Sequence, residues 1–403
     1  MWISKTYLDG LPFRFAAPPP GVAVDSRVLR TADLRDVRAL YWTPEGQRPK
    51  AAVVAMHPRV DFTQHYAFPT LLQRGWGCLG ALSRNLGDDT DTVHEDLVLD
   101  VAACVRFLRE EAGVERVVLL GNSGGGSLMG YYQSLAEQPP TSRPERTPGG
   151  RRAFLQAAPL PAADGLVLLA AHRGQGHVLL RSIDPSVTDE ADPLSLDPAL
   201  DLYDPRNGFR PSPEWSRYEP AFLERFAEGQ RARVERIDAI ARDALAARKA
   251  GRGTRAGHLA RILVVYRTTA NPATVDRTVD PSNRDYGTLV SEQPEVQNYE
   301  RLGFARVVTP EAWLSTWSGL SSRADLRQTL PGVSVPVLVV HAGADREVFP
   351  EADLGAIVAG LASDDRTVVT VDDGRHYFEP DGCPARAQAL GTVADWLGAR
   401  WTP

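Results

Sequence analysis

The sequence predicts an α/β fold, in which helices flank a mostly parallel β-sheet and a large, mainly helical segment is inserted. Apolar stretches of strand length alternate with helical patterns up to residue 172, as expected for a parallel sheet with helices on both faces. This alternation is lost between residues 173 and 334 and returns from 335 to 403. The length of 403 residues also exceeds what one hydrophobic core usually serves. We therefore expect a core of residues 1–172 and 335–403, with 173–334 as a cap.

The first strands are predicted from two kinds of apolar pattern. Residues 26–44 alternate apolar and polar side chains around a polar turn near Ala32, which is typical of a hairpin. Residues 51–56 (AAVVAM) and 77–82 (GCLGAL) are continuous apolar runs, which indicates strands buried on both faces. Helical material is expected between these two runs.

A helix is predicted to follow, because residues 92–95 (TVHE) have the sequence of a capping box and Gly113 provides a stop. Apolar residues recur within it at helical spacing. The elements expected after it are strands at 117–120, 166–170, 335–340 and 367–371, a long charged helix at about 220–249 inside the insertion, and a closing helix at 385–401.

Charge and hydropathy limit the expected partners. The 45 Lys and Arg against 51 Asp and Glu give a formal net charge of −6, which provides no general attraction for nucleic acids or anionic membranes. No apolar run approaches the length of a membrane span, and the first ten residues lack a signal-peptide core. We expect a cytoplasmic protein that acts on a small molecule. Its oligomeric state is left open, with a homodimer as one option.

A glycine-rich turn follows the predicted strand at 117–120. Its sequence, Gly121-Asn122-Ser123-Gly124-Gly125, is a G-x-S-x-G motif between a strand and a helix. A sharp turn there would expose the serine at the carboxyl edge of the sheet, where the helix N-terminus favours negative charge. A turn that only requires tight packing is the alternative interpretation.

A serine nucleophile requires a base and a carboxylate that orients the base. Asp345 follows the strand at 335–340, and His376 follows the strand at 367–371. Serine, acid and histidine thus occur in the order 123, 345, 376, each after a separate strand. Asp372 and Asp373 compete with Asp345 for the acid role, but their closeness in sequence to His376 favours a role in shaping the turn.

This arrangement resembles the α/β-hydrolase superfamily, and specifically its serine esterases and lactonases with a large cap, over residues 26–172 and 335–403. The resemblance implies that Ser123 is the nucleophile, His376 the general base and then acid, and Asp345 the carboxylate that holds the imidazole. It also implies an oxyanion hole formed by the backbone N–H of Gly124 and by a second N–H, from Arg59 or Val60, in the loop after residues 51–56.

The residues around this loop and the cap are candidates for the substrate pocket. His57 is expected to buttress the oxyanion loop, and His172 ends a strand near the active-site edge. Trp313 and Trp317 are four residues apart in a short helix that Thr309 caps, so they share a face that would line either an apolar pocket or the core of the cap. We predict a pocket lined by His57, Val60, His172, Trp313 and Trp317.

The resemblance implies a serine hydrolase that cleaves a carboxylic ester or lactone, with a bulky hydrophobic substrate suggested by the tryptophans. Cleavage of a carbon–carbon bond in a diketone-like substrate, or of a thioester or amide, uses the same triad and stays open. A non-catalytic binding protein on the same scaffold is a further alternative. No cofactor is implied, and no metal site is expected because the eight histidines lack ligand-like spacing.

Overall fold

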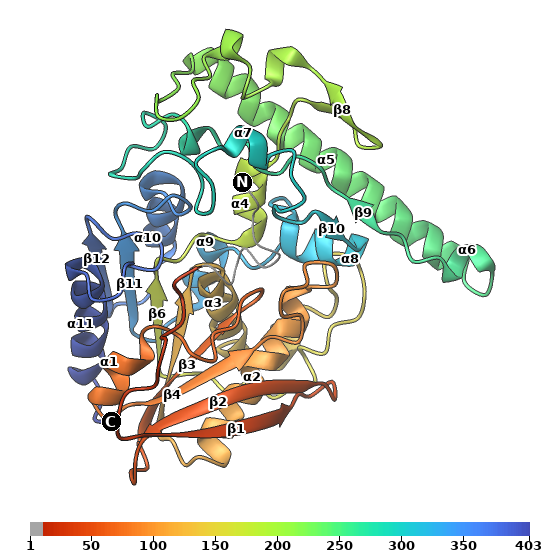
Figure 1. The fold of residues 1–403 in the computed structure, drawn as a ribbon. Helices are drawn as coiled ribbons and strands as arrows, with labels where there is room; N and C mark the ends of the chain where they lie inside the picture. Colours follow the sequence, from red (N-terminus) through yellow and green to blue (C-terminus); the bar gives the residue numbers. More distant parts are fainter. Residues whose placement is uncertain (1–10) are drawn as a thin grey trace.

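The computed structural model describes residues 11–403 and contains one eight-stranded mixed sheet with helices on both faces (Figure 1). The expectation of no signal-peptide core falls on residues 1–10, outside this range. The strands of the sheet are β1 Val22–Arg30, β2 Asp36–Pro44, β3 Ala51–His57, β4 Gly77–Leu82, β5 Arg116–Asn122, β6 Gly165–Leu169, β11 Val337–Ala342 and β12 Arg366–Val371. The predicted fold class is confirmed.

The spatial order of the strands is β1-β2-β4-β3-β5-β6-β11-β12. Pairing is antiparallel from β1 to β2 and from β2 to β4, and parallel across the rest of the sheet. Two short antiparallel ladders lie in the inserted segment, formed by β7 Val187–Asp189 with β8 Asp192–Leu196 and by β9 Leu263–Val264 with β10 Val307–Val308.

The helices cover both faces of the sheet and build most of the cap. The α-helices are α1 Phe68–Gln73, α2 His94–Glu110, α3 Gly124–Ala136, α4 Gln175–Ser182, α5 Pro220–Ala250, α6 Arg255–His258, α7 Pro294–Gln297, α8 Pro310–Ala312, α9 Leu326–Thr329, α10 Ala356–Gly360 and α11 Pro384–Gly398. Two π-helical turns are η6 Trp313–Trp317 and η8 Pro350–Gly355. Five 3₁₀ turns are η2 Pro140–Ser142, η3 Pro198–Leu200, η4 Pro205–Asn207, η5 Pro272–Thr274 and η7 Leu330–Gly332.

Strand β3 shows why a central strand reads as a continuous apolar run. Ala52, Val54 and Met56 belong to the hydrophobic cluster that α2 and α3 cover. The residues between them, such as Val53, belong to the cluster on the other face, under α1 and α11. Because side chains alternate between the faces of a strand and both faces are buried here, every position must be apolar.

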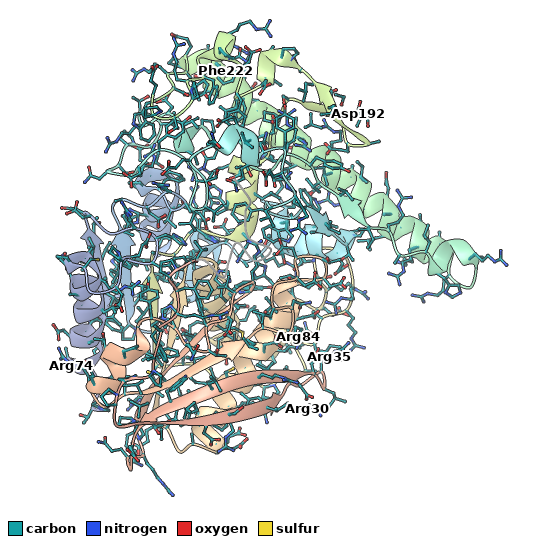
Figure 2. All side chains as sticks on the ribbon, viewed as in Figure 1. Arg30, Arg35, Arg74, Arg84, Asp192 and Phe222 are labelled. Atoms are coloured by element: carbon teal, nitrogen blue, oxygen red, sulfur yellow. The ribbon has the colours of Figure 1, made fainter. Side chains whose placement is uncertain are left out.

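The hairpin of β1 and β2 forms as predicted, with Arg30 paired to Asp36 at its tip. Arg84 fastens this tip to α2, because its guanidinium donates to Asp33 at 2.9 Å and to Asp100 at 2.8 Å. Figure 2 shows Arg84 beside Arg35 and Arg30 at this end of the hairpin, far from Phe222 and Asp192 in the cap.

The predicted capping box at the start of α2 is wrong. The Thr92 hydroxyl donates to the carbonyl of Asp88 at 2.6 Å instead of capping the helix. The carboxylate of Glu95 is buried and accepts a hydrogen bond of 2.6 Å from the hydroxyl of Ser315, in η6. That hydroxyl also accepts the backbone N–H of His94 at 3.0 Å. The inserted segment therefore supplies the cap that the local sequence was expected to provide.

The inserted segment leaves and rejoins the core at neighbouring points. The guanidinium of Arg173 donates to Asp325 at 2.7 and 2.6 Å, and the carbonyl of Arg173 accepts the N–H of Leu326 at 2.8 Å. Leu326 and Leu330 pack in the core cluster beside α3. Judged by these contacts, the chain rejoins the core near Asp325, before the expected boundary at residue 334.

The cap has its own hydrophobic core. Its main cluster includes Val234 and Ile237 of α5 together with Trp313 and Trp317 of η6. A second cluster surrounds Phe222 and Phe226 at the other end of α5. None of the helices within residues 11–403 combines the length and apolarity required to cross a bilayer.

Candidate active site

Ser123 occupies the sharp turn between β5 and α3. Its backbone has φ 53° and ψ −127°, a strained combination for a residue with a side chain. The turn also brings backbones close together, since a Cβ at Gly121 would lie 2.5 Å from the Cα of Gly126. The flanking glycines are therefore required by sterics, and the turn presents Ser123 at the carboxyl edge of the sheet.

Ser123, His376 and Asp345 are connected by two hydrogen bonds. The Oγ of Ser123 lies 2.9 Å from Nε2 of His376, and Nδ1 of the same ring lies 2.7 Å from Oδ2 of Asp345. All three residues are buried. With the ring neutral, Nδ1–H donates to Asp345 and Nε2 accepts the serine proton, which is the arrangement that a nucleophile and its base require.

Asp345 is itself held in position by the loop after β11. Its Oδ1 accepts the backbone N–H groups of Glu347 at 2.8 Å and Val348 at 3.2 Å. Oδ2 is thereby left for His376. Asp372 and Asp373, the competing acids of the sequence analysis, are exposed to solvent. The geometry therefore favours Asp345 as the orienting carboxylate.

Glu347 is a residue of the site that the sequence analysis missed. Its Oε1 lies 4.0 Å from Nε2 of His376, and its side chain lines the same cavity as Ser123. Burial raises the pKa of its carboxyl above the ordinary value. Its position two residues after Asp345 could have indicated this, because residues that follow a catalytic acid at the end of a strand lie at the same edge of the sheet.

The charge around His376 favours its protonated form. Burial alone lowers the pKa of the imidazole, but the charge and hydrogen bond of Asp345, with Glu347 and Glu379, outweigh burial and raise it to about 9. The same charges stabilise the imidazolium that forms when the ring accepts a proton from serine.

The loop after β3 does not have the geometry expected of it. The backbone N–H of Arg59 donates to Nδ1 of His57 at 2.9 Å, and that of Val60 donates to the same atom at 3.1 Å. Both amides proposed for the oxyanion hole are thus bonded to a ring instead of facing the serine. The expected role of Arg59 is corrected accordingly. Gly124 is the first residue of α3, so its N–H has no carbonyl to bond within the helix.

A cavity opens above Ser123 between the core and the cap, with about 970 Å³ of empty space including the solvent at its mouth. Of the residues expected to form the substrate pocket, His57, Val60, His172 and Trp317 line this cavity. Trp313 does not, because its fully buried ring lies in the core of the cap and its Nε1–H donates to Asp238 at 2.8 Å. Residues absent from the expected set complete the wall: Leu11, Gln175, Val178, Leu289, Val290, Phe304, Phe349 and Tyr377.

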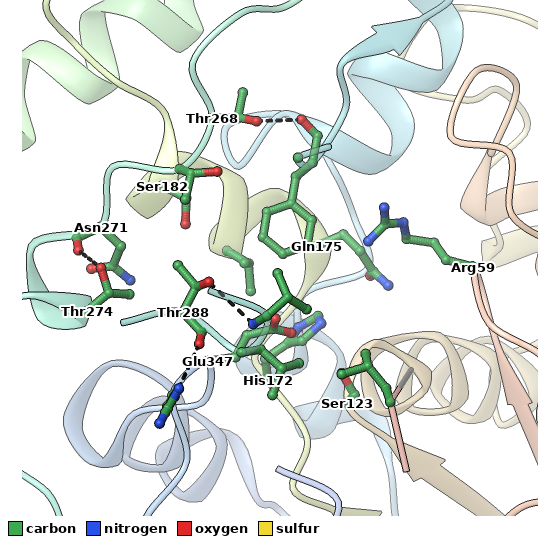
Figure 3. Close-up of a pocket in the computed structure, with 18 of the residues that line it drawn as sticks. Arg59, Ser123, His172, Gln175, Ser182, Thr268, Asn271, Thr274, Thr288 and Glu347 are labelled. Atoms are coloured by element: carbon green, nitrogen blue, oxygen red, sulfur yellow. Dashed lines mark hydrogen bonds between the residues drawn. The ribbon is translucent and has the colours of Figure 1, made fainter. Parts of the chain in front are cut away.

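The wall far from Ser123 is polar. Figure 3 shows Ser123 and Arg59 on one side of the cavity and Asn271 and Thr274 on the other. The polar groups of this wall mostly form hydrogen bonds within the cap. Thr268 donates to the carbonyl of Phe304 at 2.8 Å, and Thr274 donates to that of Asn271 at 2.7 Å. The oxygens of these hydroxyl groups can still accept hydrogen bonds from a ligand, and the amide of Asn271, whose oxygen already accepts the N–H of Ala273 at 3.1 Å, offers its NH2 group as a donor.

Arg59 forms part of the cavity rim through its side chain. Its guanidinium pairs with Asp89 at 2.6 and 3.0 Å and lies 5.3 Å from the ring centroids of both Phe304 and Trp317. It thus connects the loop after β3 to the cap. A cation held against two aromatic rings and a carboxylate fixes this part of the wall.

Two other histidines that line the cavity, His57 and His172, favour the neutral form. Burial lowers the pKa of His172 to about 3, with a smaller contribution from His376, and lowers that of His57 well below its ordinary range. Within residues 11–403, no three side chains of His, Cys, Asp or Glu are grouped as metal ligands.

Comparison with known proteins finds a likeness of structure only. No protein-family model and no curated protein matches the sequence. DcsB, solved in complex with its substrate analogue, superposes with a TM-score of 0.54 at 11% identity, covering 94% of this chain and 100% of that one. The α/β hydrolase GrgF from Penicillium sp. sh18 gives 0.46 at 12% identity, over 88% and 91%, and a bacterial brefeldin A esterase gives 0.46 at 15%, over 96% and 80%. The likeness to DcsB shows that the two chains share a fold, and the strand order and the turn at Ser123 are those of an α/β-hydrolase fold.

Proposed function

We propose that the protein is a serine hydrolase that cleaves a carboxylic ester or lactone through an acyl-enzyme. The observation that carries this proposal is the pair of hydrogen bonds from Ser123 to His376 at 2.9 Å and from His376 to Asp345 at 2.7 Å, at the floor of the cavity between the core and the cap. The strained backbone of Ser123 supports it, because such strain is typical of catalytic turns.

In the first half-reaction, Oγ of Ser123 attacks the carbonyl carbon while its proton passes to Nε2 of His376. The tetrahedral intermediate collapses when the ester C–O bond breaks and the leaving oxygen takes that proton. In the second half-reaction, His376 removes a proton from water, which attacks the acyl carbon. The bond from this carbon to Oγ then breaks, Oγ takes the proton back from Nε2, and the acid and free Ser123 are released. Asp345 keeps Nδ1 protonated throughout, so that Nε2 can accept the proton.

The cavity favours a substrate with two unlike parts. Val60, Trp317 and Tyr377 offer apolar surface, whereas the wall of Thr268, Asn271 and their neighbours offers hydrogen-bond acceptors and donors. A purely hydrophobic substrate would leave the remaining donors and acceptors of this wall unpaired, at a cost in free energy. The proposed substrate therefore combines an apolar portion with a distal portion that bears hydroxyl or amide groups.

Labelling with a fluorophosphonate tests the nucleophile. The expected result is stoichiometric modification of Ser123, no modification in Ser123→Ala, and a labelling rate at least 100-fold lower in His376→Ala, since the base is then lost. Ser134→Ala, which removes another buried serine hydroxyl of α3, is the control and keeps the wild-type rate. An unmodified Ser123 in the folded protein would contradict the proposal and favour a non-catalytic binding protein.

The bond type is tested with a substrate panel. Short and long p-nitrophenyl esters, lactones, a thioester, an anilide and a vinylogous diketone are compared by kcat/KM. Hydrolysis of esters or lactones at the highest kcat/KM is the expected result. Cleavage of the diketone with no turnover of esters and lactones would show that the carbon–carbon alternative is correct.

A further inference from the structure

We propose that the ring Nε2–H of His57, and not a backbone N–H of Arg59 or Val60, is the second donor to the carbonyl oxygen of the substrate. This inference rests on the proposed serine hydrolase function. It assigns His57 a direct catalytic role in addition to the supporting role expected from the sequence. The proton stays on the ring, and only a hydrogen bond to the developing oxyanion is formed.

The contacts of Nδ1 determine which ring nitrogen carries the proton. Nδ1 accepts two backbone N–H groups, from Arg59 at 2.9 Å and from Val60 at 3.1 Å. An atom that accepts two hydrogen bonds cannot carry a proton in the same plane. The proton of the neutral ring is therefore on Nε2, and the loop that was expected to donate to the substrate instead fixes the tautomer of His57.

Nε2 lies beside the other half of the oxyanion hole. A Cβ built on Gly124 would lie only 2.9 Å from Nε2 of His57, so this N–H lies next to the backbone whose own N–H is the first donor. His57 and Ser123 line the same cavity. Within residues 11–403 no hydrogen-bond partner of Nε2 is found.

The ring is held firmly enough to act as a preorganised donor. It is 6% exposed and contacts Phe62 edge to face, with ring centroids 5.2 Å apart. Burial, reinforced by the positive charge of Arg59, lowers its pKa and keeps it neutral at working pH. A fixed N–H aimed into a buried site stabilises developing negative charge without reorganisation during the reaction.

Gln175 is the competing donor. Its Nε2 also lies close to the Cβ position of Gly124, at 2.2 Å. However, this amide donates to the carbonyl of Gly124 at 3.3 Å, and its Oε1 accepts the hydroxyl of Ser127 at 2.9 Å. Both polar atoms of the Gln175 amide are thus hydrogen-bonded to the start of α3, whereas Nε2 of His57 forms no such hydrogen bond.

Two substitutions of His57 distinguish the roles of its two ring nitrogens. In His57→Asn, the side-chain oxygen takes the place of Nδ1 and can accept the N–H groups of the loop, but no donor replaces Nε2–H. In His57→Gln, the side-chain amide places a donor near the Nε2 position. His258→Asn, in the exposed α6, is the matched control.

The variants are compared by ester kcat and KM, by the rate of fluorophosphonate labelling and by thermal midpoint. His57→Asn is expected to lower kcat and the labelling rate about 100-fold with KM changed less than threefold, as for other lost oxyanion donors. His57→Gln is expected to retain at least tenfold more activity than His57→Asn, and His258→Asn to match the wild type. If His57 had a merely structural role, kcat and the labelling rate would fall by similar factors in both His57 variants.

Three outcomes would overturn the inference. The first is a folded His57→Asn variant whose rates lie within threefold of the wild type. The second is a 100-fold loss in Gln175→Leu but not in His57→Asn, which would make Gln175 the donor. The third is a crystal structure of the phosphonylated wild type in which the phosphoryl oxygen contacts N–H of Arg59 instead of Nε2; this measurement needs no folded variant. If the wild-type Ser123 is not labelled at all, the proposed function itself fails.

Discussion

At the scale of single residues, carboxylates dominate the chemistry of His376. Asp345 contacts its Nδ1 and Glu347 lies 4.0 Å from its Nε2, and together with Glu379 they raise its pKa to about 9 despite burial. A base must be neutral to accept the proton of serine. The free enzyme should therefore gain activity as pH rises.

The pH profile provides a test of this charge balance. For ester hydrolysis, kcat/KM is expected to rise with pH up to an apparent pKa near 9. Glu347→Gln removes a negative charge next to the imidazole, which lowers the pKa of His376 and shifts the rise to lower pH by about one unit. Glu351→Gln, an exposed control in the same region, should leave the profile unchanged. A profile that Glu347→Gln does not move would contradict the assigned role of Glu347.

At the scale of elements, the turn from β5 to α3 depends on close approach of main chains. A Cβ added to Gly126 would lie 2.4 Å from the Cβ of Ala171, which follows β6. Neither atom can rotate away. The start of α3, and with it the position of Ser123, therefore depends on the absence of a side chain at residue 126.

Two glycine-to-alanine substitutions test this dependence within helices. Gly126→Ala is expected to lower the free energy of unfolding by about 1–3 kcal/mol through overpacking, and to reduce kcat as Ser123 shifts. Gly391→Ala in α11 meets nothing within 4 Å, and should raise stability by up to about 1 kcal/mol because alanine favours helix. Chemical denaturation measures both. Equal effects at the two positions would contradict the steric argument.

The junction between α2 and η6 is a second element whose stability can be measured. Ser315 accepts the N–H of His94 and donates to the buried Glu95. Ser315→Ala leaves both groups without this partner, and is expected to cost about 2–4 kcal/mol of stability for two lost bonds to buried groups. Ser321→Ala removes a hydrogen bond made only within the inserted segment, to Leu314, and should cost about 1 kcal/mol. A smaller loss for Ser315→Ala than for Ser321→Ala would contradict the importance of the junction.

The sequence predicted what depends on local pattern and missed what depends on packing. The strands, the turn at Ser123 and the order of Asp345 and His376 follow from apolar runs and from the residues that end them. The direction of the His57 ring, the inward position of Glu347 and the burial of Trp313 depend on contacts between distant segments. Glu95 illustrates the difference, because its position in a capping pattern was overridden by a partner 220 residues away.

At the scale of the whole molecule, neutral buried histidines make the fold sensitive to acid. Burial lowers the pKa of His65 and His172 to about 3 and that of His94 and His177 to about 4, and His57 also stays well below its ordinary value. Unfolding raises each pKa to about 6.5. Their contribution to stability is therefore present above pH 6.5 and is lost as pH falls towards the native values. The raised pKa of His376 has the opposite effect, because its contribution is present below pH 6.5 and is lost as pH rises towards about 9.

Thermal unfolding at several pH values tests this proton uptake. Below pH 6.5 each of these histidines is expected to cost about 1.4 kcal/mol of stability per pH unit, so the unfolding midpoint should fall steeply between pH 6.5 and 5. His65→Gln, which can keep a donor to Asn122 in place of the ring, should reduce the slope by about one proton. A midpoint that is the same at pH 7 and pH 5 would contradict the prediction.

Helix α5 offers a practical consequence of the way the cap is built. Its 31 residues extend for about 46 Å, and no side chain after Ala241 in this helix is buried, so its end projects from the molecule towards α6 (Figure 1). Gly253, just beyond it, has a positive φ and open space around it. This tip is therefore an attachment point for a dye, a solid support or a fused domain, from which the protein can be held without obstructing access to Ser123.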